Sequence, residues 1–250
     1  MDEKLQLVSI LNTYYSITEP KINKLEGYIS TNFKIEAKGK TNILKVYDNS
    51  AEILELITAE NKILLALKDE NVHCSEIIAN NSGDYNLIIG DYIYRLLTFV
   101  SGTFLAESKH TATLMESFGQ TLADIDHSLF NLRIAAIKAK EIQWDLQHFQ
   151  KNWKYLPDIP DVSDRSLVDY FCLQFNEHIL PLKYEFRQSI IHNDANDWNV
   201  LVQNDAITGI IDFGDMCYSW LINELAIALT YVMMDKENPL EIAIQIIKAY

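Results

Sequence analysis

The signals for strands and for helices are segregated along this chain, and no other feature of the sequence constrains its fold as strongly. Alternating or short apolar runs, which are typical of strands, fall at 32–38, 43–47, 85–89 and 92–97. Helical spacing marks the same part of the chain at 2–15 and 51–69. Beyond residue 104, helical patterns cover 110–129, 131–140, 162–180 and 221–234, and strand signals return at 199–202 and 207–212. The sequence predicts a strand-rich first part with one prominent helix, and a helical second part that carries a small hairpin.

The net charge limits the kinds of molecule that the protein can bind, and the cysteine content indicates its cellular compartment. The 250 residues carry a formal net charge of −14, which repels phosphate backbones and anionic lipid. We therefore expect neither nucleic acid nor a membrane as partner, whereas a cationic small molecule is compatible. The three cysteines form neither a disulfide framework nor a metal motif, and the N-terminus lacks a signal peptide. The most apolar stretch, 220–234, is shorter than the roughly 20 residues of a membrane span. We expect a soluble, cytoplasmic protein.

The strongest chemical signal lies in residues 190–202. This segment places His192, Asp194 and Asn199 on a loop that enters an expected strand. Phosphoryl transfer uses such a set, because a carboxylate can accept the proton of an acceptor hydroxyl and an amide oxygen can bind Mg²⁺. Asp194 is therefore the candidate base and Asn199 a candidate metal ligand. We assign His192 to hydrogen bonding within the loop, since Asp194 is the better-placed base.

A second acidic motif ends the next expected strand. Residues 209–215 are Gly-Ile-Ile-Asp-Phe-Gly-Asp. Asp212 is thus expected at the end of an apolar strand, two positions before a glycine. A carboxylate in this place suits a second Mg²⁺ ligand that bridges nucleotide phosphates. Either motif alone is a weak signal, but the two in this order on successive strands indicate phosphoryl transfer.

Lys45 is a lone charge among apolar neighbours on an expected strand, and Glu60 follows in the middle of the next helix. A buried charge needs a partner such as a phosphate or a carboxylate. A lysine on a strand and a glutamate on a helix form the ion pair that orients phosphates in kinases. We therefore expect a Lys45–Glu60 pair, with Glu52 or Glu55 in the place of Glu60 if the helix register differs.

With these motifs the chain resembles the protein-kinase-like small-molecule phosphotransferases, which include aminoglycoside phosphotransferases and choline kinase, and it is most similar to their hydroxylysine kinase branch. The resemblance is carried by residues 28–33, 44–46, 95–102, 192–202, 209–218 and 224–227. It implies an α+β, bilobal protein-kinase-like fold. The parts implied are a small β-rich N-lobe with one main helix at 1–97, a hinge at 98–104, and a mostly helical C-lobe with a short catalytic hairpin at 105–250.

The resemblance also implies the ligands. The nucleotide is expected at the hinge beside Leu97 and Phe99, with Asn32 and Phe33 at the end of a phosphate loop, 27–32. Mg²⁺ is the expected metal. The donor is ATP or GTP, because GTP can serve in that branch. The implied reaction moves a γ-phosphoryl group to a hydroxyl of a small amine-bearing metabolite such as hydroxylysine, an amino alcohol or an aminoglycoside.

The chain departs from the family pattern in three places. The usual His-Gly-Asp has Asn193 at its centre, and asparagine adopts a left-handed backbone more readily than other non-glycine residues. The phosphate loop has one glycine. The family's last helices, which help close the acceptor pocket, are missing after Tyr250, and the apolar positions of 239–250 lead us to expect a chain that continues.

Two readings of function follow. Asp197, Asp215 and Glu224 would add negative charge on the acceptor side and favour an ammonium substrate, although acidic residues are common throughout this chain. The alternative is a non-catalytic nucleotide-binding scaffold or regulatory module, for example the first domain of a longer multifunctional chain. We favour an enzyme, because the groups expected for metal and phosphate are all present together with the base.

Overall fold

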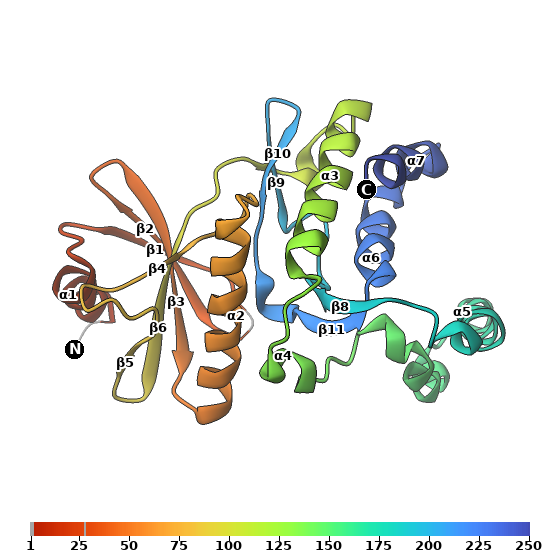
Figure 1. The fold of residues 1–250 in the computed structure, drawn as a ribbon, viewed down its shortest axis with the longest axis horizontal. Coiled ribbons are helices and arrows are strands. Elements are labelled where there is room, and N and C mark those ends of the chain that lie inside the picture. The colour runs from red at the N-terminus through yellow and green to blue at the C-terminus, as the bar shows by residue number, and fades with distance from the viewer. Residues whose placement is uncertain (1–2, 28) are drawn as a thin grey trace. The chain divides into compact units, whose positions relative to one another are not determined.

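The computed structural model of the protein describes residues 3–27 and 29–250. The chain divides into two units, Met1–Ser108 with Val200–Gly214, and Lys109–Asn199 with Asp215–Tyr250 (Figure 1). The hairpin that follows the Asp194 loop therefore packs with the strand-rich part, although the sequence places it within the expected C-lobe at 105–250. The lobe limits and the hinge at 98–104 stay predictions.

An antiparallel sheet dominates the first unit. Its strands are β1 (Lys21–Leu25), β2 (Thr31–Ala37), β3 (Lys40–Asp48), β4 (Ile77–Ile78), β5 (Leu87–Ile89) and β6 (Tyr92–Thr98). They lie in the order β1-β2-β3-β6-β4, and β5 also pairs with β6. Two helices, α1 (Glu3–Tyr15) and α2 (Ala51–Asp69), lie on opposite sides of this sheet in Figure 1.

Side chains alternate across the sheet, so each face has a core of its own. Phe33 and Leu44 are cross-strand neighbours and are buried in a cluster with residues of α1. Tyr47 and Ile93 are neighbours on the opposite face and pack with residues of α2. Ser50 caps α2, because its hydroxyl accepts a hydrogen bond from the Ile53 amide at 3.1 Å. The face of β3 that α2 covers is also the face on which Lys45 lies.

A three-stranded sheet of the same unit leads into Asp212, two residues after its last strand. It joins β7 (Thr103–Phe104), β9 (Val200–Gln203) and β10 (Ala206–Ile210) in the order β10-β9-β7. The short helix η1 (Leu105–Glu107) follows β7, and η5 (Phe213–Asp215) begins directly after Asp212. The Thr208 hydroxyl donates to the Ser101 carbonyl at 2.7 Å, and the Ile210 amide donates to the His73 carbonyl at 3.1 Å. The first bond ties the hairpin to the expected hinge, and the second ties it to the segment after α2. Together they fix the backbone from which Asp212 follows.

The second unit is mostly helical. Its elements are α3 (Ala112–Leu129), α4 (Ala135–Ala139), η2 (Leu146–Asp158), α5 (Val162–Gln174), η3 (Phe175–Ile179), η4 (Leu180–Leu182), β8 (Gln188–Ile191), β11 (Cys217–Trp220), α6 (Ile222–Met233) and α7 (Pro239–Ala249). The strands β8 and β11 pair antiparallel, and α3 contacts both β8 and α7. The loop that carries Asp194 follows β8, so this small sheet fixes the position of the first residues of the loop.

Most expected elements are present, with small shifts of their ends. The expected helix at 51–69 has the bounds of α2, and the one at 110–129 corresponds to α3. The expected α-helix at 162–180 is wrong over its last six residues, since α5 ends at Gln174 and the chain continues as η3 and η4. Pro181 lies inside η4. Because proline lacks an amide donor and clashes with the preceding turn, the turns before it leave α-helical geometry.

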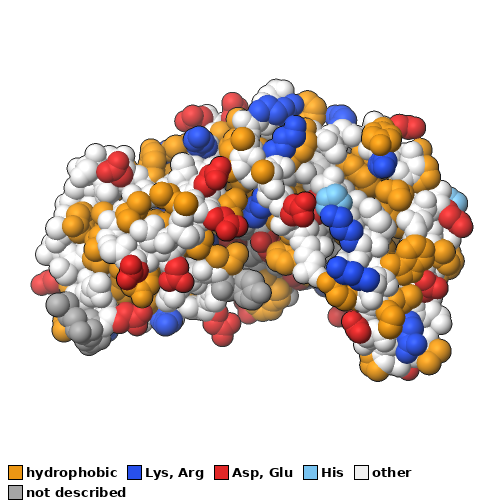
Figure 2. Space-filling view, turned by 90° about the horizontal axis from the view of Figure 1, so that it is seen from below, with side chains coloured by type: hydrophobic (Ala, Val, Ile, Leu, Met, Phe, Trp, Pro, Cys, Tyr) orange, Lys and Arg blue, Asp and Glu red, His pale blue; other side chains and the backbone are white. Residues whose placement is uncertain are grey.

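Large apolar side chains remain exposed on α5. Leu167, Tyr170 and Phe171 are each more than half exposed. Figure 2 shows hydrophobic and charged side chains side by side at its right-hand end, the end that α5 occupies in Figure 1. Within the described residues, every helix is too short or too polar to cross a membrane.

The crossing of α3 and α7 yields a stability prediction. A Cβ atom on Gly119 would collide with the backbone carbonyl of Ile246, so Gly119→Ala has to push α7 away. Alanine favours an isolated helix by about 1 kcal/mol over glycine. We nevertheless expect a net loss of about 1–3 kcal/mol in the free energy of unfolding, measured by urea titration. Glu116→Ala, on the exposed side of α3, is the control and should change it by less than about 0.5 kcal/mol. A stabilised Gly119→Ala protein would contradict this crossing.

Candidate active site

Lys45 and Asp212 form an ion pair inside the first unit, with 2.8 Å between Nζ and Oδ1. The lysine side chain is 15% exposed and the aspartate side chain 55% exposed. The cation is thus largely buried, while the anion stays accessible to a ligand. Asp212 has a φ of 64°, a left-handed conformation that costs a non-glycine residue about 1–3 kcal/mol and is concentrated at functional sites.

The surroundings of Lys45 keep it charged. Desolvation by itself lowers the pKa of a buried ammonium. Interactions with Tyr47, Asp212 and Glu60 outweigh that effect, so the pKa of Lys45 is raised above its ordinary value. Lys45 is therefore a permanent cation over the physiological pH range, as a phosphate ligand has to be.

Glu60 has a different ion-pair partner from the one expected. Its Oε2 lies 3.0 Å from Nη1 of Arg95, a fully buried arginine on β6. Burial alone would raise the pKa of Glu60. The positive charges of Arg95 and, to a smaller extent, Lys45 lower it by more than burial raises it, so the pKa of Glu60 is below its usual value. Lys45 thus acts on Glu60 electrostatically while its own ion pair is with Asp212. The arginine was missed in the sequence, although a lone charge in the apolar run 92–97 is the signal that singled out Lys45.

The strand register separates the expected nucleotide-binding residues. Asn32 is the cross-strand neighbour of Lys45, and Lys45 is the neighbour of Arg95, so these three share one face. Phe33 lies on the opposite face, where its side chain is buried with residues of α1. The expectation that Phe33 lines the nucleotide site is corrected by this register, because the alternation of a strand turns its ring into the core.

Asn32 orders the loop between β1 and β2. Its Nδ2 donates to the Glu26 carbonyl at 3.2 Å, and its Oδ1 accepts the Ser30 hydroxyl at 2.8 Å. A Cβ on Gly27 would collide with the Ser30 carbonyl, so this position of the expected phosphate loop requires glycine. Tyr28, in the middle of that loop, lies outside the described residues.

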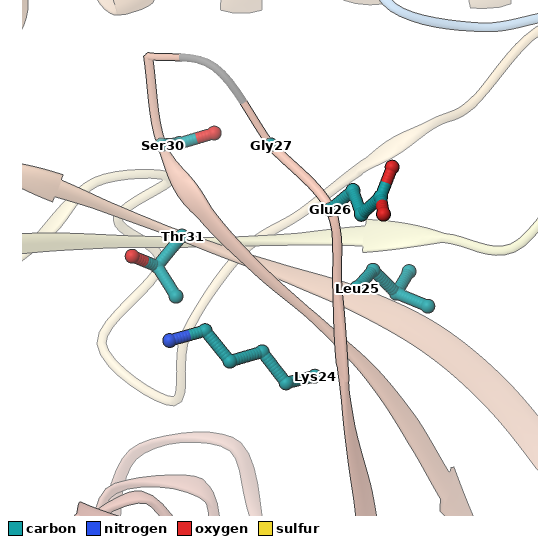
Figure 3. Close-up of a pocket in the computed structure, with 6 residues that line it drawn as sticks. All are labelled: Lys24, Leu25, Glu26, Gly27, Ser30 and Thr31. Carbon is teal, nitrogen blue, oxygen red and sulfur yellow. The ribbon is translucent and has the colours of Figure 1, made fainter.

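The same loop lines an open surface pocket of about 680 Å³. Its lining residues are Lys24, Leu25, Glu26, Gly27, Ser30 and Thr31. Figure 3 shows Lys24 and Thr31 pointing to one side of the two strands, and Leu25 and Glu26 to the other. Lys24 is the cross-strand neighbour of Phe33, so this basic and hydroxyl-bearing side of the loop belongs to the face of Phe33 and not to the face of Lys45.

The two expected hinge residues differ in exposure. Leu97 is buried, and its neighbours on adjacent strands are Ile43 and Ile77. Phe99 is 37% exposed, and the Lys34 ammonium lies 4.9 Å from the centre of its ring. Of these two residues, Phe99 is therefore the one accessible to a ligand, and its ring can stack against a flat base. Lys34, which lies beside that ring, was missed by sequence reasoning.

The Asp194 carboxylate is held in the second unit by two asparagines. Asn196 Nδ2 donates to its Oδ1 at 2.8 Å, and Asn199 Nδ2 donates to its Oδ2 at 2.7 Å. The Asp194 amide in turn donates to Nδ1 of His192 at 3.2 Å. His192 thus hydrogen-bonds within the loop, as predicted. Asn196 was missed, although an asparagine two positions after the base is a usual side-chain hydrogen-bonding partner in such loops.

Glu224 of α6 anchors this loop from below the surface. It is fully buried, and its Oε2 accepts hydrogen bonds from the backbone amides of His192 and Asn193. The expectation that Glu224 adds charge on the acceptor side is therefore wrong, because its carboxyl points into the interior. Desolvation, and then the nearby Asp126, raise the pKa of Glu224 well above its usual value.

Asn199 and Asp212 each carry a side-chain oxygen of the type that Mg²⁺ prefers. With Nδ2 of Asn199 committed to Asp194, its side-chain oxygen remains as a neutral ligand, and the exposed Asp212 supplies a carboxylate. Within the described residues no group of three or more His, Cys, Asp and Glu is placed to hold a metal ion by itself. Mg²⁺ is commonly bound through one or two protein ligands together with substrate phosphates, and Asn199 of the second unit and Asp212 of the first each offer a ligand of that kind.

Comparison with known proteins gives a consistent family. The model of a phosphotransferase enzyme family matches residues 22–250. A hydroxylysine kinase of Mus musculus is 24% identical, over 98% of this chain and 73% of its own length.

Solved structures share the fold at lower sequence identity. A microcompartment-associated aminopropanol kinase superposes with a TM-score of 0.76 at 17% identity, over 99% of this chain and 80% of its own. An amicoumacin kinase in complex with AMP-PNP, Ca²⁺ and Ami has a TM-score of 0.74 at 15% identity, over 100% and 76%. The expected α+β protein-kinase-like fold is confirmed.

Asn193 tests the backbone requirement of the loop. Its φ is 65°, so asparagine occupies the left-handed conformation predicted for this position. We expect Asn193→Gly to fold with a stability within about 0.5 kcal/mol of wild type, whereas Asn193→Val should lose about 2 kcal/mol or more, because a β-branched residue is strained there. Urea unfolding of the two variants measures the difference. Equal stability of both would contradict the left-handed loop.

Asp126 predicts an unusual pH dependence. Its burial raises its pKa to about 7, against the effects of the Tyr250 hydroxyl and Arg187. Between about pH 4 and pH 7 the folded protein holds a proton on Asp126 that the unfolded chain has lost. The contribution of Asp126 to the free energy of unfolding is therefore fully present below about pH 4 and is lost as the pH rises through 7. We expect Asp126→Asn to remove this fall and to be more stable than wild type at pH 8 by at least about 1 kcal/mol, since one pKa unit is worth about 1.4 kcal/mol. Asp124→Asn, on the exposed side of the same helix, should keep the wild-type slope.

Proposed function

Because this chain belongs to the phosphotransferase enzyme family, we propose that it transfers the γ-phosphoryl group of ATP or GTP to a hydroxyl of a small amine-bearing metabolite. The observation that carries the proposal is the Asp194 carboxylate, held by two asparagine amides in the loop that runs directly into the hairpin of Asp212. The two amides set the direction of the carboxylate that is to accept a proton.

In this reaction the oxygen of the acceptor hydroxyl attacks the γ-phosphorus, and Asp194 accepts the proton of that hydroxyl. The bond to the bridging β–γ oxygen breaks, and the nucleoside diphosphate leaves. Lys45 exchanges Asp212 for the phosphates and balances their charge. Mg²⁺, held through Asn199 and Asp212, would supply neutralisation of the charge that develops on the phosphate oxygens. The work of the protein is positioning and electrostatics.

Charge and relatives support an amine-bearing acceptor. Hydroxylysine kinase and aminopropanol kinase are named for hydroxyl compounds that carry an amine, and the net charge of −14 attracts a cation. We place the activity in the cytoplasm, where the three buried cysteines, Cys74, Cys172 and Cys217, stay as free thiols.

The proposal predicts a separation of binding from turnover. Asp194→Asn should reduce turnover at least about 1,000-fold with hydroxylysine or aminopropanol as acceptor, while the Mg²⁺-dependent thermal shift with ATP or GTP stays within about 1 °C of wild type. Nucleotide consumption in a coupled assay and a melting curve measure the two effects. Asp124→Asn, the same change at an exposed position of α3, is the control and should keep its turnover within about threefold. Full activity of Asp194→Asn would remove Asp194 from the mechanism, and wild type without a nucleotide shift would reject the proposed function.

A further inference from the structure

Trp198 is a large apolar residue of the base loop that the proposed reaction does not use. It is 55% exposed, and it is the one exposed residue of 191–200, all of which the structure describes. Every other residue of that segment, including the base Asp194, is buried or half-buried. A single exposed apolar side chain is common on protein surfaces. What distinguishes Trp198 is the way in which it is attached to the base.

One side chain ties the backbone of Trp198 to the Asp194 carboxylate. Asn196 Nδ2 donates to Asp194 Oδ1 at 2.8 Å, and Asn196 Oδ1 accepts the Trp198 amide at 2.8 Å. Two hydrogen bonds and one amide group thus separate the Trp198 nitrogen from the carboxylate, a path of at most about 8 Å. The Asn199 amide donates to the Asn196 carbonyl at 3.0 Å and closes a turn over 196–199. The indole therefore starts from a point held at a short, fixed distance from the base.

This distance suits an acceptor that carries both a hydroxyl and an amine. A cation is attracted to the face of an indole when it lies within about 6 Å of the ring centre. In a small amino alcohol only a few carbon atoms separate the ammonium from the hydroxyl. When such a hydroxyl contacts Asp194, the indole of Trp198 can therefore reach the ammonium of the same molecule.

The charge of the loop selects the same kind of ligand. Residues 190–203 contain two carboxylates, Asp194 and Asp197, and neither lysine nor arginine. Asp197 directly precedes Trp198 in the turn. Carboxylates attract a cation, and indole is the aromatic ring that binds one best. A neutral alcohol would have neither interaction.

We propose that Trp198 determines acceptor specificity, with its indole face against the ammonium group of a substrate whose hydroxyl contacts Asp194. The inference rests on the proposed function, since it assigns Asp194 to the acceptor hydroxyl. Trp198 takes no part in proton transfer or in nucleotide binding. Its contribution is the same before and during the reaction, so it belongs to the KM of the acceptor and not to kcat.

Steady-state kinetics with hydroxylysine and with 1-amino-2-propanol, at saturating Mg²⁺–ATP or Mg²⁺–GTP, tests this assignment. Trp198→Leu should raise the KM of the better acceptor at least about fivefold and leave kcat within about threefold of wild type. Trp198→Phe keeps a weaker aromatic face, and its KM should fall between the two. In both variants the Kd of the Mg²⁺–nucleotide, measured by calorimetry, should stay within about twofold.

Fluorination of the ring separates a cation–π contact from a merely structural role. Mono-, di- and trifluorinated tryptophan, inserted at position 198 alone, keep the shape of the side chain and progressively weaken the negative charge of its face. The acceptor KM should rise with each fluorine. Tyr92→Leu is the control, because it also replaces an exposed aromatic residue by leucine, on β6 of the first unit. It should leave the acceptor KM within about twofold.

Three outcomes overturn the inference. They are an unchanged acceptor KM in Trp198→Leu, a KM that does not respond to fluorination, and a loss in Tyr92→Leu equal to that in Trp198→Leu. If Trp198→Leu does not fold, the fluorinated proteins, which keep the shape of the ring, decide alone.

The wild type separates this inference from the proposed function. Wild type that binds nucleotide but accepts neither amine, or accepts propane-1,2-diol as well as 1-amino-2-propanol, overturns the inference alone. Wild type that binds neither nucleotide rejects the proposed function, and this inference with it.

Discussion

Burying charge is costly, and the first unit of this protein buries Lys45 and Arg95 of its sheet together with Glu60 of α2, which covers the same face. The cost is contained only if every charge has a partner at hydrogen-bonding distance. Because the register sets the two cations Lys45 and Arg95 side by side, α2 has to present Glu60 to Arg95, and the β9–β10 hairpin has to bring Asp212 to Lys45. Much of the architecture of this unit follows from that requirement.

The second unit solves a related problem with neutral donors. Asp194 is oriented by the amides of Asn196 and Asn199, which hold its direction without adding positive charge that would weaken it as a base. Behind the loop, the buried Glu224 collects two backbone amides. The Asp194 carboxylate is left for chemistry, and the buried carboxyl group of Glu224 fixes the loop from which Asp194 projects.

The sequence predicts most of this where the signal is local. Helical spacing defines α2 to its end residues, and the spacing of Asp194 and Asn199 brings together two side chains that the structure joins by a hydrogen bond. The strand β1 carries no such signal, because only one of its five residues is buried and its apolar pattern does not alternate. The partner of Glu60 could not be read locally either, since it depends on which of two cations the sheet register brings within reach. Phe33 was misplaced for the same reason, as its face is decided by pairing with Leu44.

The first unit is discontinuous, since the hairpin from Val200 to Gly214 completes a sheet that begins before residue 108. During synthesis on the ribosome, the early strands and α2 emerge with Lys45 long before the carboxylate of Asp212 exists. Domains generally fold as units in the order of translation, but here the earlier unit must wait for most of the later one to be made. The nascent chain therefore carries a lysine without its ion-pair partner through the synthesis of residues 109–199, which makes this stage the one at which a chaperone has the most to protect.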